Sequence, residues 1–126
     1  MRLLLDSSVI IDALRLKANT INYLKKIESK DAKLFVSAVT AFEIYSGSSS
    51  ANTDEKKLIK KLMGYFEVVD LSWSIGKLAG ELYRKTTSKV ETADYLIAAS
   101  AIEVGAQIVT LNKKHFQKMP KIKLYE

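Results

Sequence analysis

The segment RLLLDSSVIIDAL, residues 2–14, passes directly from a strand pattern into a helix pattern. Residues 3–5 form a short continuous apolar run, as expected of a strand that is covered on both faces. Asp6 ends this run, and residues 7–16 then place apolar side chains at helical spacing. A buried strand that leads into a helix predicts the first unit of an α/β fold, with an acidic residue where the two meet.

The same alternation of strands and helices continues along the chain. Strands are predicted at residues 2–6, 33–37, 65–71 and 107–111, and 122–125 is a candidate fifth. Helices are predicted at 7–16, 20–29, from Ser37 to Gly47, at 53–62, at 72–85, and from a Thr92 cap to Gly105. Strands separated by helices imply right-handed crossovers and a mostly parallel sheet of four or five strands.

The composition narrows the class of protein. A chain of 126 residues with 48% hydrophobic and 27% charged residues predicts a single globular domain over residues 1–126. The sequence shows neither a membrane-span pattern nor a signal-peptide pattern. Zero Cys excludes disulfides and thiolate zinc sites. We therefore expect a cytoplasmic protein that is not associated with a membrane. The net charge of +6 fits a polyanionic partner, although Lys-rich surfaces also serve solubility.

Four polar side chains stand where an apolar run meets a helix: Asp6, Glu43, Asp94 and Asn112. Ligand sites in parallel sheets form at the carboxyl ends of the strands, so we expect these residues to converge. Carboxylates gathered in one place repel one another unless a cation neutralises them. The pattern predicts a metal-dependent site, and oxygen ligands without Cys favour Mg²⁺ or Mn²⁺ over Zn²⁺.

Each of these residues also has a purely structural explanation. Asp6 would cap the helix that follows it, Asp94 would complement a helix dipole, and Asn112 would be a turn residue. Glu43 is harder to explain in this way, because it lies between apolar residues on a helix and a buried carboxylate without a partner is costly. The occurrence of all four at one sheet edge favours a shared site.

Three segments of the chain, taken together, resemble the PIN-domain ribonucleases, and among them the VapC toxins of prokaryotic toxin–antitoxin pairs. They are LLLDSSVIIDAL (3–14), VSAVTAFEIYSG (36–47) and ADYLIAASAIEVGAQIVTLNKKHF (93–116). The resemblance covers essentially the whole chain. It implies a three-layer α/β/α sandwich, and Mg²⁺- or Mn²⁺-dependent endoribonuclease activity on RNA phosphodiester bonds as the toxin of a type II toxin–antitoxin system.

The resemblance also assigns residues to the site. Asp6, Glu43 and Asp94 match the metal-binding acids of the family, which form the catalytic set. We predict Asp6 and Asp94 as principal ligands, with Glu43 holding or orienting the metal-bound water. Ser8 matches a small polar position beside the first acid. Asn112 matches a position that is Asp in many members and Asn in others, so it is a further candidate ligand.

Other residues are predicted to support this set or to contact the substrate. Ser8 and Thr110 would supply neutral oxygens or hydrogen bonds to the ligands. The candidate RNA contacts are Lys113 and Lys114 at the rim of the site, with Arg84, Lys85 and Lys89 as a second basic cluster; a solvated Lys surface is the alternative. The only histidine, His115, is predicted to be structural or solvated rather than catalytic.

The resemblance further implies a homodimer and a cognate VapB-like antitoxin whose C-terminal segment covers the active site. The main alternative is a non-catalytic PIN-like module that binds RNA or protein, with Asn112 marking a weakened metal site. Phosphoryl-transfer domains are disfavoured, because they require further acids close to Asp6, where Ser7 and Ser8 stand. The sequence leaves open the RNA target, the number of metals and the identity of the antitoxin.

Overall fold

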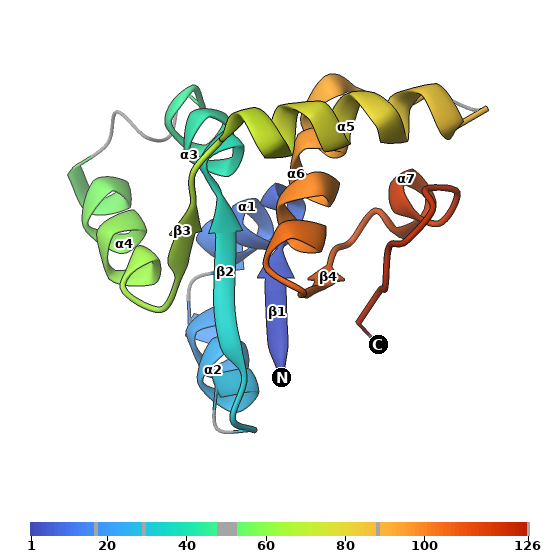
Figure 1. Cartoon of the computed structure of the whole chain (residues 1–126). Helices are drawn as coiled ribbons and strands as arrows, with labels where there is room; N and C mark the ends of the chain where they lie inside the picture. Colours follow the sequence, from blue (N-terminus) through green and yellow to red (C-terminus); the bar gives the residue numbers. More distant parts are fainter. Residues whose placement is uncertain (17, 29, 48–52, 88, 126) are drawn as a thin grey trace.

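The computed structural model describes residues 1–16, 18–28, 30–47, 53–87 and 89–125 (Figure 1). Its strands are β1 (Arg2–Leu5), β2 (Lys33–Ser37), β3 (Glu67–Val69) and β4 (Gln107–Val109), and they form one sheet in the order β3-β2-β1-β4. Every pair is parallel, with Leu4 opposite Phe35 on one side and Ile108 on the other. The predicted parallel sheet is confirmed, with four strands.

Helices cover both faces of this sheet. They are α1 (Ser7–Leu16), α2 (Ala18–Glu28), α3 (Ala38–Tyr45), α4 (Thr53–Met63), α5 (Trp73–Lys85), α6 (Thr92–Glu103) and α7 (Lys113–Phe116). Figure 1 shows α5 and α6 in front of the sheet and α1 and α2 behind it. The predicted three-layer sandwich is therefore confirmed. No helix within the described part of the chain has the length and apolar character to cross a membrane.

The central strand shows why the apolar run near the start specifies this architecture. Leu3 and Leu5 pack into a cluster with side chains of α1, α2 and α4, whereas Leu4 packs on the opposite face with α5 and α6. All three side chains are fully buried. Because neighbouring side chains of a strand point to opposite faces, a strand that is covered on both faces needs an unbroken apolar run.

Four predicted strands are shorter in the structure: those predicted at 2–6 and 107–111 end at Leu5 and Val109, and the other two differ more. The strand predicted at 65–71 is formed only by 67–69, because the amides of Tyr65 and Phe66 bond the last carbonyls of α4 at 3.0 and 3.1 Å. The candidate strand at 122–125 is a single bridge between Ile108 and Leu124. These segments carry strand-like sequences, but their backbone groups have partners outside a regular ladder.

Several predicted helix boundaries also differ. Helix α6 is capped by Glu91 rather than Thr92, and this cap makes no side-chain hydrogen bond. The same helix ends at Glu103, two residues before the glycine that was predicted to end it. Gly105 has a φ of 66° and follows the C-cap, which is the position that favours glycine after a helix. The helix predicted at 20–29 begins earlier, at Ala18, and residue 29 lies outside the described residues.

The ends of β1, β2 and β4 lie at the carboxyl edge of the sheet. Helices α1 and α3 begin within two residues of the ends of β1 and β2, so their first turns lie at this edge. The amide of Asp6 donates to the carbonyl of Val109 at 2.9 Å, which joins the end of β1 to the end of β4. The chain after β4 therefore starts beside the chain after β1.

Candidate active site

Asp6 is buried at the end of β1, with only 4% of its surface exposed. Its Oδ2 atom accepts hydrogen bonds from Ser8 Oγ and from Thr110 Oγ1, both at 2.8 Å. Each hydroxyl is held in turn, because Ser8 Oγ accepts from the amide of Leu111 and Thr110 Oγ1 from the amide of Asn112. Both residues that were predicted as supporting residues thus contact Asp6 directly, and they fix one of its two oxygens.

Glu43 is half-buried on α3, and its carboxylate has the partner that its position demands. Its Oε1 atom accepts a hydrogen bond from Ser7 Oγ at the first position of α1. Ser7 Oγ also lies 3.1 Å from Thr40 Oγ1, one turn before Glu43 on α3. Ser7 and Thr40 are both buried, at 4% and 0% exposure. Neither was predicted from the sequence as part of the site.

Asp94 lies in the first turn of α6, with 15% of its side chain exposed. Its Oδ2 atom is 3.1 Å from Nδ1 of His115, which belongs to α7 and is 45% exposed. The prediction that His115 is structural or solvated stays a prediction, and the structure shows that its imidazole contacts one of the predicted metal ligands. An acid followed by a histidine 21 positions later is not a spacing that predicts contact.

The charges around Asp94 indicate that the three acids share one electrostatic environment. Burial raises the pKa of Asp94 above its usual value of 3.8. His115 lowers this pKa, whereas the negative charges of Asp6, Glu43 and Glu91 raise it. Because Asp6 and Glu43 act on Asp94 from β1 and α3, negative potential accumulates at the carboxyl edge of the sheet. A cation bound there would relieve it.

The three acids present their oxygens in the same way. One oxygen of each is engaged by a protein donor, whereas Oδ1 of Asp6, Oε2 of Glu43 and Oδ1 of Asp94 accept no hydrogen bond from any described residue. Within the described residues, no group of three or more Asp, Glu, His or Cys side chains is placed so that it could hold a metal ion. A few separate carboxylate oxygens fit Mg²⁺ or Mn²⁺, because Mg²⁺ is bound by one or two carboxylates and keeps several waters.

Asn112 borders the site through its backbone. Its amide donates to Thr110 Oγ1 at 2.9 Å, and its side chain makes no capping hydrogen bond to α7. The exposed side chain lines a surface hollow of about 590 Å³, together with Lys113, Lys114 and His115. The two rim lysines therefore lie on the same hollow as the histidine that contacts an acid of the site.

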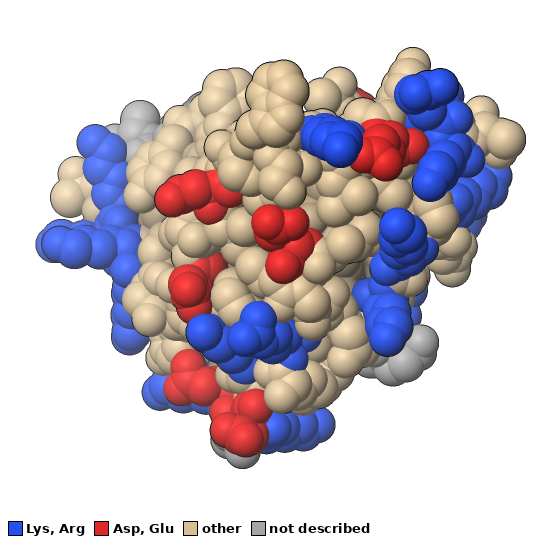
Figure 2. Space-filling model, in the orientation of Figure 1, with Lys and Arg blue, Asp and Glu red and all other residues tan. Residues whose placement is uncertain are grey.

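The second predicted basic cluster is divided. Arg84 and Lys85, at the end of α5, line a separate hollow of about 300 Å³ with Glu81. Lys89 instead donates to carbonyls at the end of α5, including that of Tyr83, and its Nζ lies 4.2 Å from the centre of the Tyr83 ring. Lys89 thus bonds carbonyl groups at the C-terminal end of this helix. Figure 2 shows Lys and Arg gathered at the left and right margins of one face of the molecule.

Comparison with known proteins places the chain in a family. The sequence matches the PIN domain family over residues 3–122. It is 32% identical to ribonuclease VapC10 of Mycobacterium tuberculosis over 124 residues, which cover 96% of this chain and 90% of that protein. It is 25% identical to the tRNA(fMet)-specific endonuclease VapC of Salmonella typhimurium, over 98% and 96% of the two chains. The chain therefore belongs to the PIN-domain family, among its VapC-type members.

Solved structures share the same fold. A chain in the crystal structure of VapBC2 from Rickettsia felis, bound to a DNA fragment from their promoter, superposes with a TM-score of 0.84 at 23% identity and covers 99% of this chain and 98% of that one. A chain of VapBC-1 from nontypeable Haemophilus influenzae gives 0.81 at 21% identity, over 100% and 98%. The fold implied by the sequence resemblance is confirmed.

Proposed function

We propose that this protein is a VapC-type endoribonuclease, which hydrolyses RNA phosphodiester bonds as the toxin of a type II toxin–antitoxin pair. One observation carries the proposal: Asp6, Glu43 and Asp94 lie at one edge of the sheet, and each keeps one oxygen that accepts no hydrogen bond from the described residues. Relatives that are named as a ribonuclease and as an endonuclease support the reaction class.

The residues suit a cofactor of Mg²⁺ or Mn²⁺. Asp6 and Asp94 would hold the ion through their unengaged oxygens, and Asn112 is a further candidate ligand. When bound there, a divalent cation would lower the pKa of a water and offset charge on the phosphate. Glu43, held through Oε1, presents Oε2 to orient the attacking water and to accept its proton. Ser8 and Thr110 keep the carboxylate of Asp6 in place.

The basic rim suits the substrate. Lys113 and Lys114 are exposed on the hollow that begins at Thr110, so they would contact phosphates on either side of the cleaved bond. Arg84 and Lys85 form a second basic patch, which a longer RNA would reach. Lys89 is the weakest of the predicted contacts, because its ammonium group already binds carbonyls of α5.

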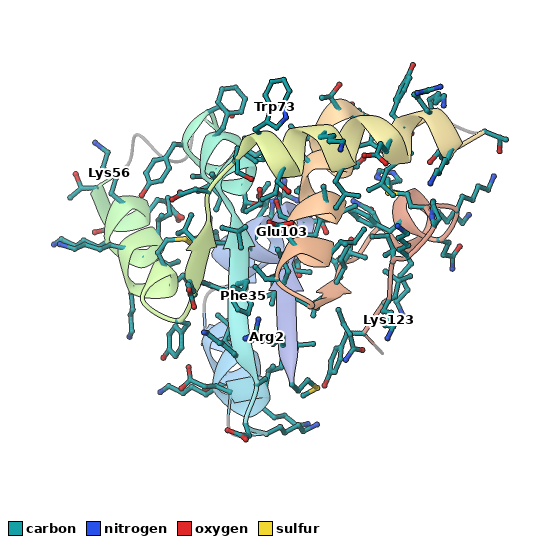
Figure 3. All side chains as sticks on the ribbon, in the orientation of Figure 1. Arg2, Phe35, Lys56, Trp73, Glu103 and Lys123 are labelled. Carbon is teal, nitrogen blue, oxygen red and sulfur yellow. The ribbon has the colours of Figure 1, made fainter. Side chains whose placement is uncertain are left out.

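Exposed apolar side chains support a protein partner. Phe42 and Trp73 are 74% and 89% exposed, and Tyr45 and Leu71 are about half-exposed. Figure 3 shows Trp73 projecting away from the fold at the start of α5. Where such groups form one contiguous patch, they mark an interaction site. The similar VapBC structures are toxin–antitoxin complexes, so we propose a VapB-like antitoxin as a partner of this chain. We also propose that the chain forms a homodimer and that it is cytoplasmic.

A cleavage assay tests the proposed function. Purified wild-type protein should cut end-labelled RNA when Mg²⁺ or Mn²⁺ is present and should not cut it when EDTA is present. Asp6→Asn should abolish cleavage without unfolding the protein, whereas Asp70→Asn is the matched control, because Asp70 is an exposed acid that follows β3. Wild-type protein that binds RNA but cuts it with neither metal would instead support the non-catalytic module.

A further inference from the structure

The segment that follows α7 presents two lysines on the outside of the sheet edge. Two backbone hydrogen bonds, of 2.8 and 2.9 Å, hold this segment to Ile108 of β4. Ile122 and Leu124 pack against the core on the side of α5 and α6. Lys121 and Lys123 alternate with these two residues, and both are exposed. The backbone of the segment is therefore fixed along β4, and its two lysines face solvent.

These lysines lie close to the hollow at the proposed site. Gln117 lines that hollow, and Lys121 is four positions further along the chain, so their Cα atoms are at most about 14 Å apart. The Cα atoms of Lys121 and Lys123 are at most about 7 Å apart, which is comparable with the spacing of neighbouring phosphates along a nucleic acid strand. Figure 1 shows α7 and the segment after it on the same side of the molecule, and Figure 3 shows Lys123 there. The segment therefore extends the basic rim of the hollow.

The protein does not neutralise these positive charges. Lys113, Lys114, Lys121 and Lys123 form no ion pair with any residue that the structure describes. Lys33, in contrast, is paired with Glu67 at 3.0 Å. Unpaired cations on adjoining segments favour a polyanion, because each contact with a phosphate releases counterions from the nucleic acid.

We propose that Lys121 and Lys123 form an additional RNA-binding surface, which contacts the phosphates of a strand that extends beyond the hollow. The inference rests on the proposed ribonuclease function, and it adds a preference for RNA that is longer than the hollow can hold. A nucleic acid strand carries a negative charge at every nucleotide, whereas an acidic protein segment would need carboxylates at this particular spacing. The surface supplies affinity rather than sequence recognition, because phosphate contacts do not read the bases.

RNA binding by the Asp6→Asn protein in EDTA tests this surface separately from cleavage. Two single-stranded RNAs are compared, of about four and about sixteen nucleotides, which span the usual range of single-strand site sizes. Adding Lys121→Gln and Lys123→Gln should weaken binding of the longer RNA about fivefold, the factor expected for two exposed charge contacts. Binding of the shorter RNA should not change. For the longer RNA, the slope of log affinity against log salt should become shallower by about 1.4, as two lost contacts to a single strand predict.

Two matched variants in the same background show whether position or charge alone matters. Lys56→Gln with Lys57→Gln removes the same charge from exposed positions of α4 and should leave both affinities unchanged. Figure 3 shows Lys56 on the opposite side of the molecule from Lys123. Lys121→Arg with Lys123→Arg keeps both charges and should bind both RNAs as the Asp6→Asn protein does.

Several results would overturn the surface while leaving the proposed cleavage intact. One is an unchanged affinity of the Lys121→Gln, Lys123→Gln protein for the longer RNA, and another is equal weakening by the Lys56→Gln, Lys57→Gln pair. Polyglutamate of matched charge should bind less tightly than the longer RNA; equal or tighter binding would assign the surface to an acidic protein segment instead. Wild-type protein that neither binds nor cuts RNA overturns the surface and the proposed function together.

Discussion

Thr110→Val should destabilise the metal-free protein by about 1.5 kcal/mol, because it removes the hydroxyl that donates to Asp6 at 2.8 Å. Valine has nearly the shape of threonine, so the change creates little cavity at this buried position. A hydrogen bond to a charged group contributes roughly 1.5–3 kcal/mol. The lower end applies here, because Ser8 Oγ continues to donate to the same oxygen. For a domain of this size the melting temperature should fall by roughly 5–8 °C.

Urea denaturation in EDTA measures this difference, with the slope of the transition as a check that the unfolded state is unchanged. Thr86→Val is the control, because Thr86 is also buried but donates to the neutral carbonyl of Leu82. Its cost should be nearer 1 kcal/mol, and it should leave Mn²⁺ binding unchanged, whereas Thr110→Val should weaken it. A Thr110→Val protein as stable as the wild type would refute the proposed hold on Asp6.

Three further outcomes are expected. Burial and neighbouring carboxylates raise the pKa of Asp94 in the folded state. Protonated Asp94 therefore adds to the free energy of unfolding below about pH 3.8, and this contribution is lost as the pH rises through the raised pKa. Asp94→Asn should therefore be more stable than the wild type in EDTA at neutral pH, and the difference in unfolding free energy should close towards pH 3.8; a constant difference would contradict this. Asn112→Asp should lower the metal concentration for half-maximal cleavage, because a further carboxylate strengthens the local negative potential. If the metal titrations of the wild type and the variant superimpose, Asn112 is a turn residue and not a ligand. RNA binding by Asp6→Asn should weaken steeply as salt rises, and the slope should decrease in a Lys113→Ala, Lys114→Ala background; an equal slope would remove these lysines from the interface.

Patterns that arise from neighbouring residues could be predicted from the sequence. The apolar run at 3–5 specified a buried central strand, because covering both faces of a sheet requires it. The strand predicted at 65–71 was too long, because strand-like residues in that segment have backbone groups that bond the end of α4. Residue type alone does not show whether backbone groups bond a neighbouring strand or the end of a helix.

The acids of the candidate site and the two hydroxyls that bond Asp6 could be predicted, but the partners of Glu43 and Asp94 could not. Asp6 stands where β1 meets α1, Glu43 lies in the helix that follows β2, and Asp94 lies in the first turn of α6. The carboxyl ends of parallel strands, where ligand sites form, lie at one edge of the sheet. Ser7 and His115 contact Glu43 and Asp94 across 36 and 21 positions of the chain, and these contacts depend on how α1 packs beside α3 and α6 beside α7. Periodicity describes one element at a time, so it gives no signal for a contact between two.

The central claim is that Asp6 and Asp94 hold one cation beside Glu43, and the melting temperature with and without Mn²⁺ tests it most directly. An ion that binds only the folded state stabilises it by about 2.7 kcal/mol at a hundredfold excess over its dissociation constant. The wild type should therefore melt roughly 10 °C higher in saturating Mn²⁺ than in EDTA. The Asp6→Asn, Asp94→Asn double variant should lose most of this increase, whereas an increase equal to that of the wild type would contradict the shared site.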